Sequence, residues 1–247
     1  MTKPFQDRIA VVTGASRGIG RAAALALAEA GAHVVAVART QGALEELDDD
    51  IRAAGGSPAT LVPLDVTDLD ALDRLGLALY ERWGKLDVFV GNAGVLGALT
   101  PLAHLDQKVW DQTMAVNVTA NWRLLRSFDP LLRASDAGRA ILVTSGAAHL
   151  GEAYWGPYAA SKAALEALGR AYAAETAKTK IRVMMLNPGP LRTRMRASAF
   201  PGEQPEKLRT PEDLAPEILR LASPDWTETG KIFDFPSGKV LTHRAPE

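Results

Sequence analysis

Short apolar runs alternate with longer helical patterns, and this alternation constrains the fold more than any other feature of the sequence. Most of the runs are rich in Val, Ile and Leu, as is typical of strands that are buried on both faces of a sheet. The runs span residues 8–13, 33–38, 60–64, 86–91, 140–145, 181–187 and 231–235, and the predicted helices span 18–30, 41–54, 69–83, 106–133, 157–179 and 211–223. Alternating strands and helices indicate βαβ units. We therefore predict an α/β fold with a doubly wound parallel sheet of about seven strands and helices on both faces, with residues 1–247 in a single domain.

Composition and charge exclude several functions. The 247 residues include no cysteine, which excludes disulfides, thiolate catalysis and cysteine metal sites, and the four histidines lack ligand spacing, so we expect no metal site. The formal net charge is -1 without a basic stripe, so we expect no nucleic-acid partner. The longest block of like charge, Asp48-Asp49-Asp50, is interpreted as a solvated helix face. The first apolar run is too short for a signal-peptide core or a membrane span, so we expect a cytoplasmic protein without a membrane partner.

A glycine-rich turn follows the first predicted strand, at the edge where open α/β sheets bind ligands. The chain there reads Thr13-Gly14-Ala15-Ser16-Arg17-Gly18-Ile19-Gly20 and then enters a helix. Glycines let the backbone approach a pyrophosphate, and the helix N-terminus offers free N–H groups and the positive end of its dipole. The spacing G-x-x-x-G-x-G differs from the standard G-x-G-x-x-G fingerprint, and a plain tight turn is the alternative. We interpret the segment as a dinucleotide site that Gly14, Ser16, Arg17, Gly18, Ile19 and Gly20 contact.

The end of the second predicted strand indicates which dinucleotide binds. A carboxylate there would hold the ribose hydroxyls of NAD, whereas an arginine accommodates the 2′-phosphate of NADP. The chain has Ala38-Arg39-Thr40 with no acid before Glu45, so we predict NADP(H), with NAD less favoured. Arg17 is a second candidate cation, and the alternative is that both arginines are simply solvated. Later turns complete the predicted pocket with Asp65 and Val66 at the adenine and with the small segment Asn92, Ala93 and Gly94.

A tyrosine and a lysine stand four residues apart in the segment Tyr158-Ala-Ala-Ser-Lys162. The surrounding helix formers, with Pro157 suited to a first turn, place both side chains on one face of a helix. Taken alone, such a pair is usually a solvated helix surface. In a catalytic site the same pair would serve proton transfer, because a nearby ammonium lowers the phenol pKa from its usual value of about 10.

Together these segments resemble the short-chain dehydrogenase/reductase family in its compact single-domain branch, over essentially the whole chain. The matching motifs are TGASRGIG at 13–20, NAG at 92–94, Asn117, Ser145, YAASK at 158–162 and NPGPLRT at 187–193. The resemblance implies a Rossmann fold and a homodimer or homotetramer in which the helices at 106–133 and 157–179 pack against partner copies. Gly91 departs from the first asparagine that the family often carries, and it is expected to be harmless because small residues fit there.

The resemblance also assigns residue roles. It implies a catalytic tetrad of Asn117, Ser145, Tyr158 and Lys162. Tyr158 would be the acid/base, Lys162 would lower its pKa and hold the nicotinamide ribose, and Ser145 would bond the substrate oxygen as charge builds there. Asn117 would hold a water that links Lys162 to solvent. Pro188 and Gly189 would line the nicotinamide, and Thr193 would bond its carboxamide or the phosphates.

The predicted function is an NADP(H)-dependent oxidoreductase that interconverts a carbonyl and a secondary alcohol of a small molecule. A 3-oxoacyl thioester, a small ketone and a sugar are candidate substrates. One alternative is a catalytically silent NADP-binding sensor or scaffold, against which the complete tetrad argues, and another is an epimerase or dehydratase. Residues 191–210 are the predicted substrate lid, where Arg192, Arg194, Arg196, Lys207 and Arg209 either meet an anionic substrate or are solvated. His149, Tyr154 and Trp155 line the substrate cleft or pack a loop.

Overall fold

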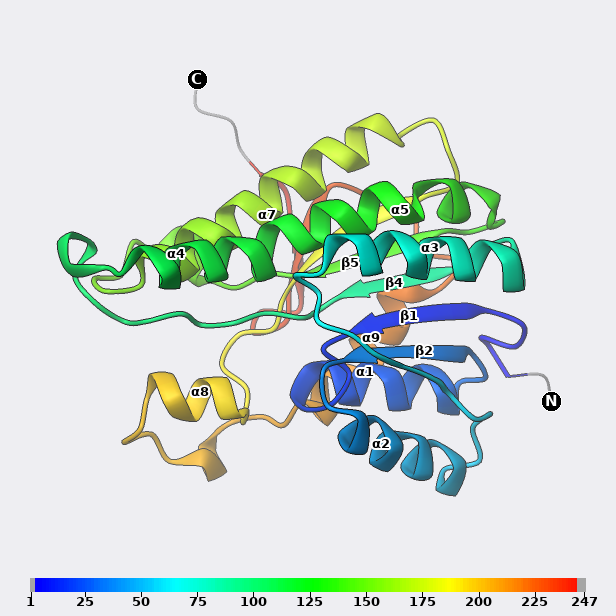
Figure 1. Ribbon diagram of the computed structural model, residues 1–247, viewed down its shortest axis with the longest axis horizontal. Coiled ribbons are helices and arrows are strands. Elements are labelled where there is room, and N and C mark those ends of the chain that lie inside the picture. Colours follow the sequence, from blue (N-terminus) through cyan, green and yellow to red (C-terminus); the bar gives the residue numbers. More distant parts are fainter. Residues whose placement is uncertain (1–2, 244–247) are drawn as a thin grey trace.

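The strands of the computed structural model, which describes residues 3–243, form an eight-stranded sheet in the order β3-β2-β1-β4-β5-β6-β7-β8 (Figure 1). Their bounds are β1 Ile9–Thr13, β2 His33–Ala38, β3 Thr60–Pro63, β4 Val88–Gly91, β5 Arg139–Val143, β6 Arg182–Asn187, β7 Lys231–Asp234 and β8 Lys239–Leu241. Strands β1 to β7 pair in parallel, as predicted, and β8 pairs antiparallel with β7. The sequence does not predict β8, because this short strand has mostly exposed side chains and no apolar run. Residues 1–2 and 244–247 of the predicted domain lie outside the described residues.

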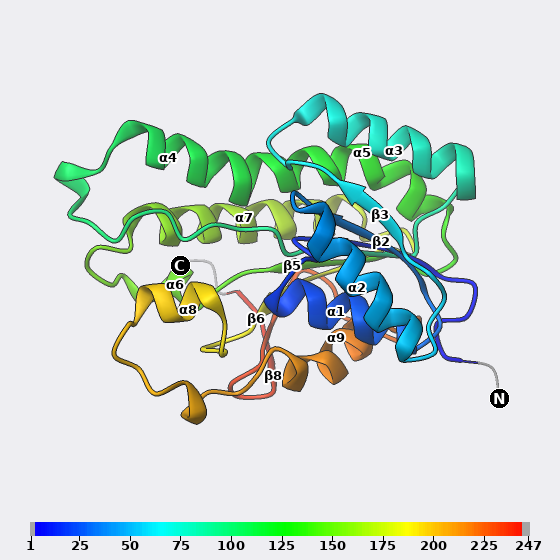
Figure 2. The ribbon, with the colours of Figure 1, turned by 60° about the horizontal axis from the view of Figure 1, so that its bottom comes forward.

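Helices cover both faces of the sheet. Helices α1 (Gly18–Glu29), α2 (Gln41–Ala53) and α9 (Ala215–Ala222) lie on one face, and α3 (Leu69–Trp83), α4 (Gln107–Met114), α5 (Ala120–Ala134) and α7 (Gly156–Glu175) lie on the other (Figures 1 and 2). The short helices α6 (Ala147–Leu150) and α8 (Arg194–Ala199) lie near each other beyond the carboxyl ends of the strands (Figure 2). Strand order reverses between β1 and β4, which makes this edge the expected ligand site of a doubly wound sheet.

The predicted helix 106–133 is divided in the structure. A π-helical turn, η2 (Ala115–Thr119), separates α4 from α5, and it contains Asn117. Apolar periodicity does not predict this turn, because one wide turn hardly changes the pattern of buried positions. Such turns recur at functional sites, where the extra residue redirects side chains. The predicted helix 211–223 likewise begins with a 3-10 turn, η4 (Glu212–Leu214), before α9.

Apolar side chains of the strands enter two separate cores. In β1, Ala10 and Val12 face the core under α1, whereas Ile9 and Val11 face the core under α3 and α5. Every residue of β1 is buried, because successive side chains of a strand point to opposite faces and both faces are covered. A strand that is buried on both faces therefore needs a continuous apolar run, whereas a strand that is exposed on one face would alternate apolar and polar residues.

Asp48 is buried, which corrects the interpretation of Asp48-Asp49-Asp50 as a solvated face. Its Oδ1 accepts the Ala59 N–H at 2.6 Å, and its Oδ2 accepts from Arg52 at 2.8 Å. Asp48 follows the buried Leu47 on the inward side of α2, whereas Asp49 is exposed. The carboxylate is tolerated there because both of its oxygens have donors.

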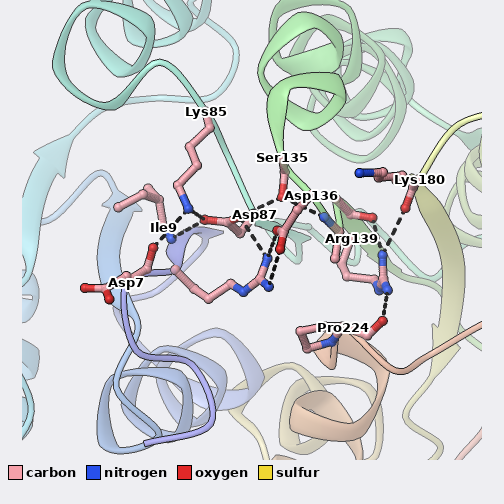
Figure 3. Close-up of polar contacts among 12 residues, drawn as sticks. Asp7, Ile9, Lys85, Asp87, Ser135, Asp136, Arg139, Lys180 and Pro224 are labelled. Carbon is pink, nitrogen blue, oxygen red and sulfur yellow. Dashed lines mark hydrogen bonds and ion pairs between the residues drawn. The ribbon is translucent and has the colours of Figure 1, made fainter. Parts of the chain in front are cut away.

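A second buried carboxylate, Asp87, joins the amino ends of the central strands (Figure 3). Asp87 accepts the Ile9 N–H at 2.8 Å, the Ser135 hydroxyl at 2.6 Å and a guanidinium N–H of Arg8 at 3.0 Å. Nearby, the buried Arg139 donates to four backbone carbonyls, those of Gly138, Lys180, Ser223 and Pro224. These contacts lie at the amino ends of the strands, on the side of the sheet away from the glycine-rich turn at the carboxyl ends.

Candidate active site

The glycine-rich turn between β1 and α1 is shaped by positions that exclude a side chain. Gly14 and Gly18 have φ angles of +66° and +56°, and a Cβ on Gly20 would lie 2.3 Å from the Gly14 carbonyl oxygen. Arg17 precedes α1 in an extended conformation, and no side chain caps this helix. The first N–H groups of α1 therefore remain available to an anion.

The turn after β4 is fixed to the glycine-rich turn. The Thr13 hydroxyl accepts the N–H groups of Asn92 and Ala93, both at 3.0 Å. The Asn92 amide donates to the Thr13 carbonyl at 2.9 Å. Two predicted cofactor segments, far apart in the sequence, are thus held together by Thr13, which is buried at the end of β1.

A cavity of about 1520 Å³ lies over the carboxyl ends of β1 to β4. It is lined by most of the predicted cofactor residues: Gly14, Ser16, Arg17, Gly18, Ile19, Arg39, Asp65, Val66, Asn92, Ala93, Gly94 and Thr193. Gly20 does not line it, because Gly20 packs behind the turn against Gly14. The uncapped helix end, the close-packed glycines and the cavity together fit an extended dinucleotide.

Arg39 lies at the open end of this cavity with two thirds of its side chain exposed. Its nearest charge is Asp65, whose Oδ2 lies 3.9 Å from Arg39 Nη1. The Thr67 N–H lowers the pKa of Asp65 most, and the Thr67 hydroxyl and Arg39 lower it further, against a smaller opposing effect of burial. Asp65 is therefore ionised and offsets part of the Arg39 charge without covering the guanidinium.

Tyr158 lies buried in a second, adjoining cavity of about 510 Å³ at the carboxyl ends of β5 and β6. Ser145, Lys162, Pro188 and Gly189, four of the predicted site residues, also line this cavity. Burial raises the pKa of Tyr158, and a hydrogen bond with Ser145 opposes this rise. The Lys162 Nζ lies 5.7 Å from the centre of the Tyr158 ring, and the effect of burial prevails in the pKa of this phenol.

Lys162 is almost completely buried one helical turn after Tyr158. Its Nζ donates to the Val143 carbonyl at 2.8 Å, which fixes the ammonium under the end of β5. Burial lowers the pKa of Lys162 to about 8, and the charge of Glu166 opposes this fall. The ammonium is therefore retained at neutral pH.

Glu166 is a buried charge at this site that the sequence does not reveal. Its Oε1 accepts the Thr144 hydroxyl at 2.7 Å, and its Oε2 lies 2.9 Å from His149 Nε2. Arg170 lies one turn further along α7, 3.7 Å from Oε2. The only signal in the sequence is the spacing of four residues from Lys162, which puts both side chains on one helix face.

His149, Tyr154 and Trp155, which were expected either to line the substrate cleft or to pack a loop, have different surroundings in the structure. Trp155 lines the second cavity. His149 instead contacts Glu166, and Tyr154 is exposed with a φ angle of +74°. Of the three, only Trp155 fulfils the cleft interpretation.

Asn117 is fully buried within the π-helical turn. Its Oδ1 accepts the Val95 N–H at 2.8 Å, and its Nδ2 donates to the Val95 carbonyl and the Ser161 hydroxyl, both at 2.9 Å. These bonds tie the segment after β4 to α7. The side chain therefore positions the site, and the relay water remains a prediction.

Gly91 is required here by packing. A Cβ at this position would lie 2.4 Å from Asn121 Oδ1 and 2.9 Å from Leu142 Cδ2. Asn121 in turn donates to the Asn117 carbonyl at 3.0 Å. The departure from the family pattern thus makes room for a side chain that supports the π-helical turn.

The predicted lid 191–210 is closed at its base. Leu191 and Arg209 form a β-bridge, and the Arg192 N–H donates to the Arg209 carbonyl at 2.8 Å. Thr193 lines both cavities, and its hydroxyl accepts the Arg196 N–H at 3.2 Å, which caps α8. Helix α8 therefore projects from a fixed base over the second cavity.

None of the helices within residues 3–243 is long and apolar enough to cross a membrane. Residues 3–243 also contain no cluster of three or more histidine, aspartate or glutamate side chains suited to a metal ion.

Comparison with known proteins places the geometry in context. The family model for short chain dehydrogenases matches residues 8–204. The uncharacterized oxidoreductase YciK of Escherichia coli is 39% identical over 238 residues, which cover 95% of this chain and 94% of YciK. A short chain dehydrogenase from Shigella flexneri, crystallised in complex with NADP, is 38% identical with a TM-score of 0.90 and covers 95% of this chain and 99% of its own. A short chain dehydrogenase from Escherichia coli, crystallised with NADPH, is also 38% identical with a TM-score of 0.90. The match covers 95% of this chain and 98% of that protein.

Proposed function

The chain belongs to the short-chain dehydrogenase/reductase family of oxidoreductases, and on this premise we propose that it uses NADP(H) to interconvert a carbonyl and a secondary alcohol. The observation that carries the proposal is the meeting of Tyr158, Ser145 and Lys162 in one cavity that adjoins the dinucleotide-shaped groove. In the reductive direction the nicotinamide supplies the hydride to the carbonyl carbon. The protein must then supply a proton to the carbonyl oxygen.

Tyr158 is the proposed proton donor. Because burial raises its pKa, the phenol holds its proton at neutral pH and can deliver it to the oxygen that gains charge. Ser145 is the proposed second hydrogen-bond partner of that oxygen, and it faces the same cavity. Lys162 keeps a positive charge beside the Tyr158 ring, which favours the phenolate that remains after proton transfer.

The preference for NADP(H) over NAD rests on Arg39 and Arg17. Both line the first cavity, and Arg39 exposes most of its guanidinium at the end of β2. A 2′-phosphate needs such donors, and the segment 38–40 offers no carboxylate to ribose hydroxyls. The NADP and NADPH bound to the two related structures support the same choice.

Replacing Tyr158 with phenylalanine tests the proposal, because only a hydroxyl is removed. We expect turnover with NADPH to fall about 10²–10⁴-fold, while NADPH affinity and unfolding free energy stay near those of the wild type. A panel of ketones, aldehydes and 3-oxoacyl thioesters provides the substrates. Turnover of the variant near the wild-type rate would refute the role of Tyr158. Failure of the wild type to reduce any of them would favour a silent NADP-binding protein.

We also propose that the protein is a homodimer or homotetramer that associates through α4, α5 and α7. Trp122 on α5 supports this, because an indole with more than a third of its area exposed is a typical anchor of an interface. Light scattering at micromolar concentration tests the assembly, and a monomer would contradict it.

A further inference from the structure

The second cavity has an apolar wall that the proposed proton transfer does not use. The wall is formed by Leu150, Trp155, Pro190, Leu191, Met195 and Phe200. The ring centre of Trp155 lies 5.6 Å from that of Phe200 and 5.9 Å from that of Tyr158. A continuous aromatic surface therefore leads from the lid to the proposed proton donor.

The charged side chains that line this cavity are either hydrogen-bonded to other groups of the protein or are acidic and repel anions. Lys162 is bonded to the Val143 carbonyl. Arg196 donates two hydrogen bonds to the Glu203 carboxylate at 2.6 and 2.7 Å, and its guanidinium carbon lies 3.7 Å from the centre of the Phe200 ring. Glu152 is exposed and has no ion pair within residues 3–243. Apart from the buried Lys162, which the proposed proton transfer already uses, the substrate end of the cavity thus offers no cation without a carboxylate partner.

The remaining basic residues of the lid are directed elsewhere. Arg192 and Arg194 line the cofactor cavity and not the substrate cavity. Arg209 lies over the Phe235 ring at 4.7 Å, and Lys207 is exposed and lines neither cavity. Of the basic residues of the lid, only Arg196 thus lines the substrate cavity, and Glu203 offsets its charge.

We infer that the cleft selects an uncharged carbonyl compound with a flat apolar body, such as an aromatic ketone, and discriminates against carboxylate- or phosphate-bearing carbonyls. The carbonyl part rests on the proposed function, whereas the neutral apolar body rests on the cavity itself. An aromatic ring would pack on Trp155 and Phe200. A carboxylate there would lose hydration without gaining a cation and would face Glu152. In reduction, hydride joins the carbonyl carbon, the Tyr158 proton joins the oxygen, and NADPH becomes NADP⁺.

A matched pair of substrates tests the inference. Para-methylacetophenone and para-carboxyacetophenone have similar size and differ in charge. We expect the wild type to favour the methyl compound in kcat/KM by at least about ten-fold. Glu203→Gln should lower this preference for the methyl compound, because the substitution frees the Arg196 guanidinium to bind the substrate carboxylate. Glu206→Gln, an exposed acid of the same lid, is the control and should leave the ratio unchanged.

Equal or better use of the carboxylate by the wild type would overturn the inference, and so would equal ratios in the Glu203→Gln and Glu206→Gln variants. Equilibrium binding of the two ketones to the enzyme with NADP⁺ separates this inference from the proposed function, because NADP⁺ cannot donate hydride. Tighter binding of the methyl compound without turnover by NADPH would uphold the cleft specificity and refute the reductase. Turnover by NADPH with a preference for the carboxylate compound would uphold the reductase and refute the cleft specificity.

Discussion

Two aspartates that accept from the same nitrogen of Arg8, Asp87 and Asp136, provide a quantitative test of stability (Figure 3). Asp136 lies closer to Arg8 Nη1, at 2.6 Å, than Asp87 does, at 3.0 Å. Burial separates them much further, because the Asp136 side chain is 69% exposed and that of Asp87 is 0% exposed. Burial and not distance should therefore decide the cost of removing each.

Asp87→Ala leaves several donors without their acceptor. The Ile9 N–H and the Ser135 hydroxyl are buried, and Arg8 and Lys85 lose a partner at 3.0 Å. Removing one partner of a buried ion pair costs about 3–5 kcal/mol of unfolding free energy. For a domain of this length that corresponds to a fall in Tm of roughly 6–20 °C. Asp136→Ala should cost only about 0–1 kcal/mol, because solvent screens the exposed pair.

Urea unfolding followed by tryptophan fluorescence, at one protein concentration, measures both variants. NADPH-dependent turnover per folded molecule should be unchanged in each, because these residues lie at the edge of the sheet opposite the cavities. Equal losses in the two variants would show that burial does not set the energy. A loss of less than about 1 kcal/mol for Asp87→Ala would refute the reasoning outright.

Two further outcomes concern the cofactor and the lysine. Arg39→Ala should weaken the binding of NADPH about 10- to 100-fold and that of NADH little, and Ala38→Asp should shift the preference toward NADH. The measurement is the ratio of kcat/KM for NADPH and NADH. A wild type that prefers NADH, or a ratio that Arg39→Ala does not change, would exclude phosphate recognition at this turn. Because burial lowers the pKa of Lys162 to about 8, kcat/KM for NADPH should decline as pH rises through that value and the ammonium loses its proton. Glu166→Gln removes the charge that raises the pKa of Lys162, so the decline should begin at lower pH, and an unmoved profile would count against an electrostatic effect of Glu166.

The sequence alone determines the fold class and most of the residues expected to line the first cavity, for local reasons. Buried parallel strands need continuous apolar runs, and the glycines of 14–20 are needed because the turn admits no side chains at Gly14 and Gly20. Helix spacing also brings Tyr158 and Lys162 to one face without reference to any other element. In parallel strands all carboxyl ends meet at one edge, so the strand order suffices to collect these segments into one groove.

Only the tertiary structure decides how charged side chains are paired. Arg196 lies in α8 and Glu203 in the turn after it, and their pairing depends on the course of the lid between Leu191 and Arg209. Burial likewise separates Asp48 and Asp87 from their solvated counterparts Asp49 and Asp136, although the residue type is the same at all four positions. The physical reason is that charge energies depend on desolvation and on partners distant in sequence, neither of which a local pattern contains.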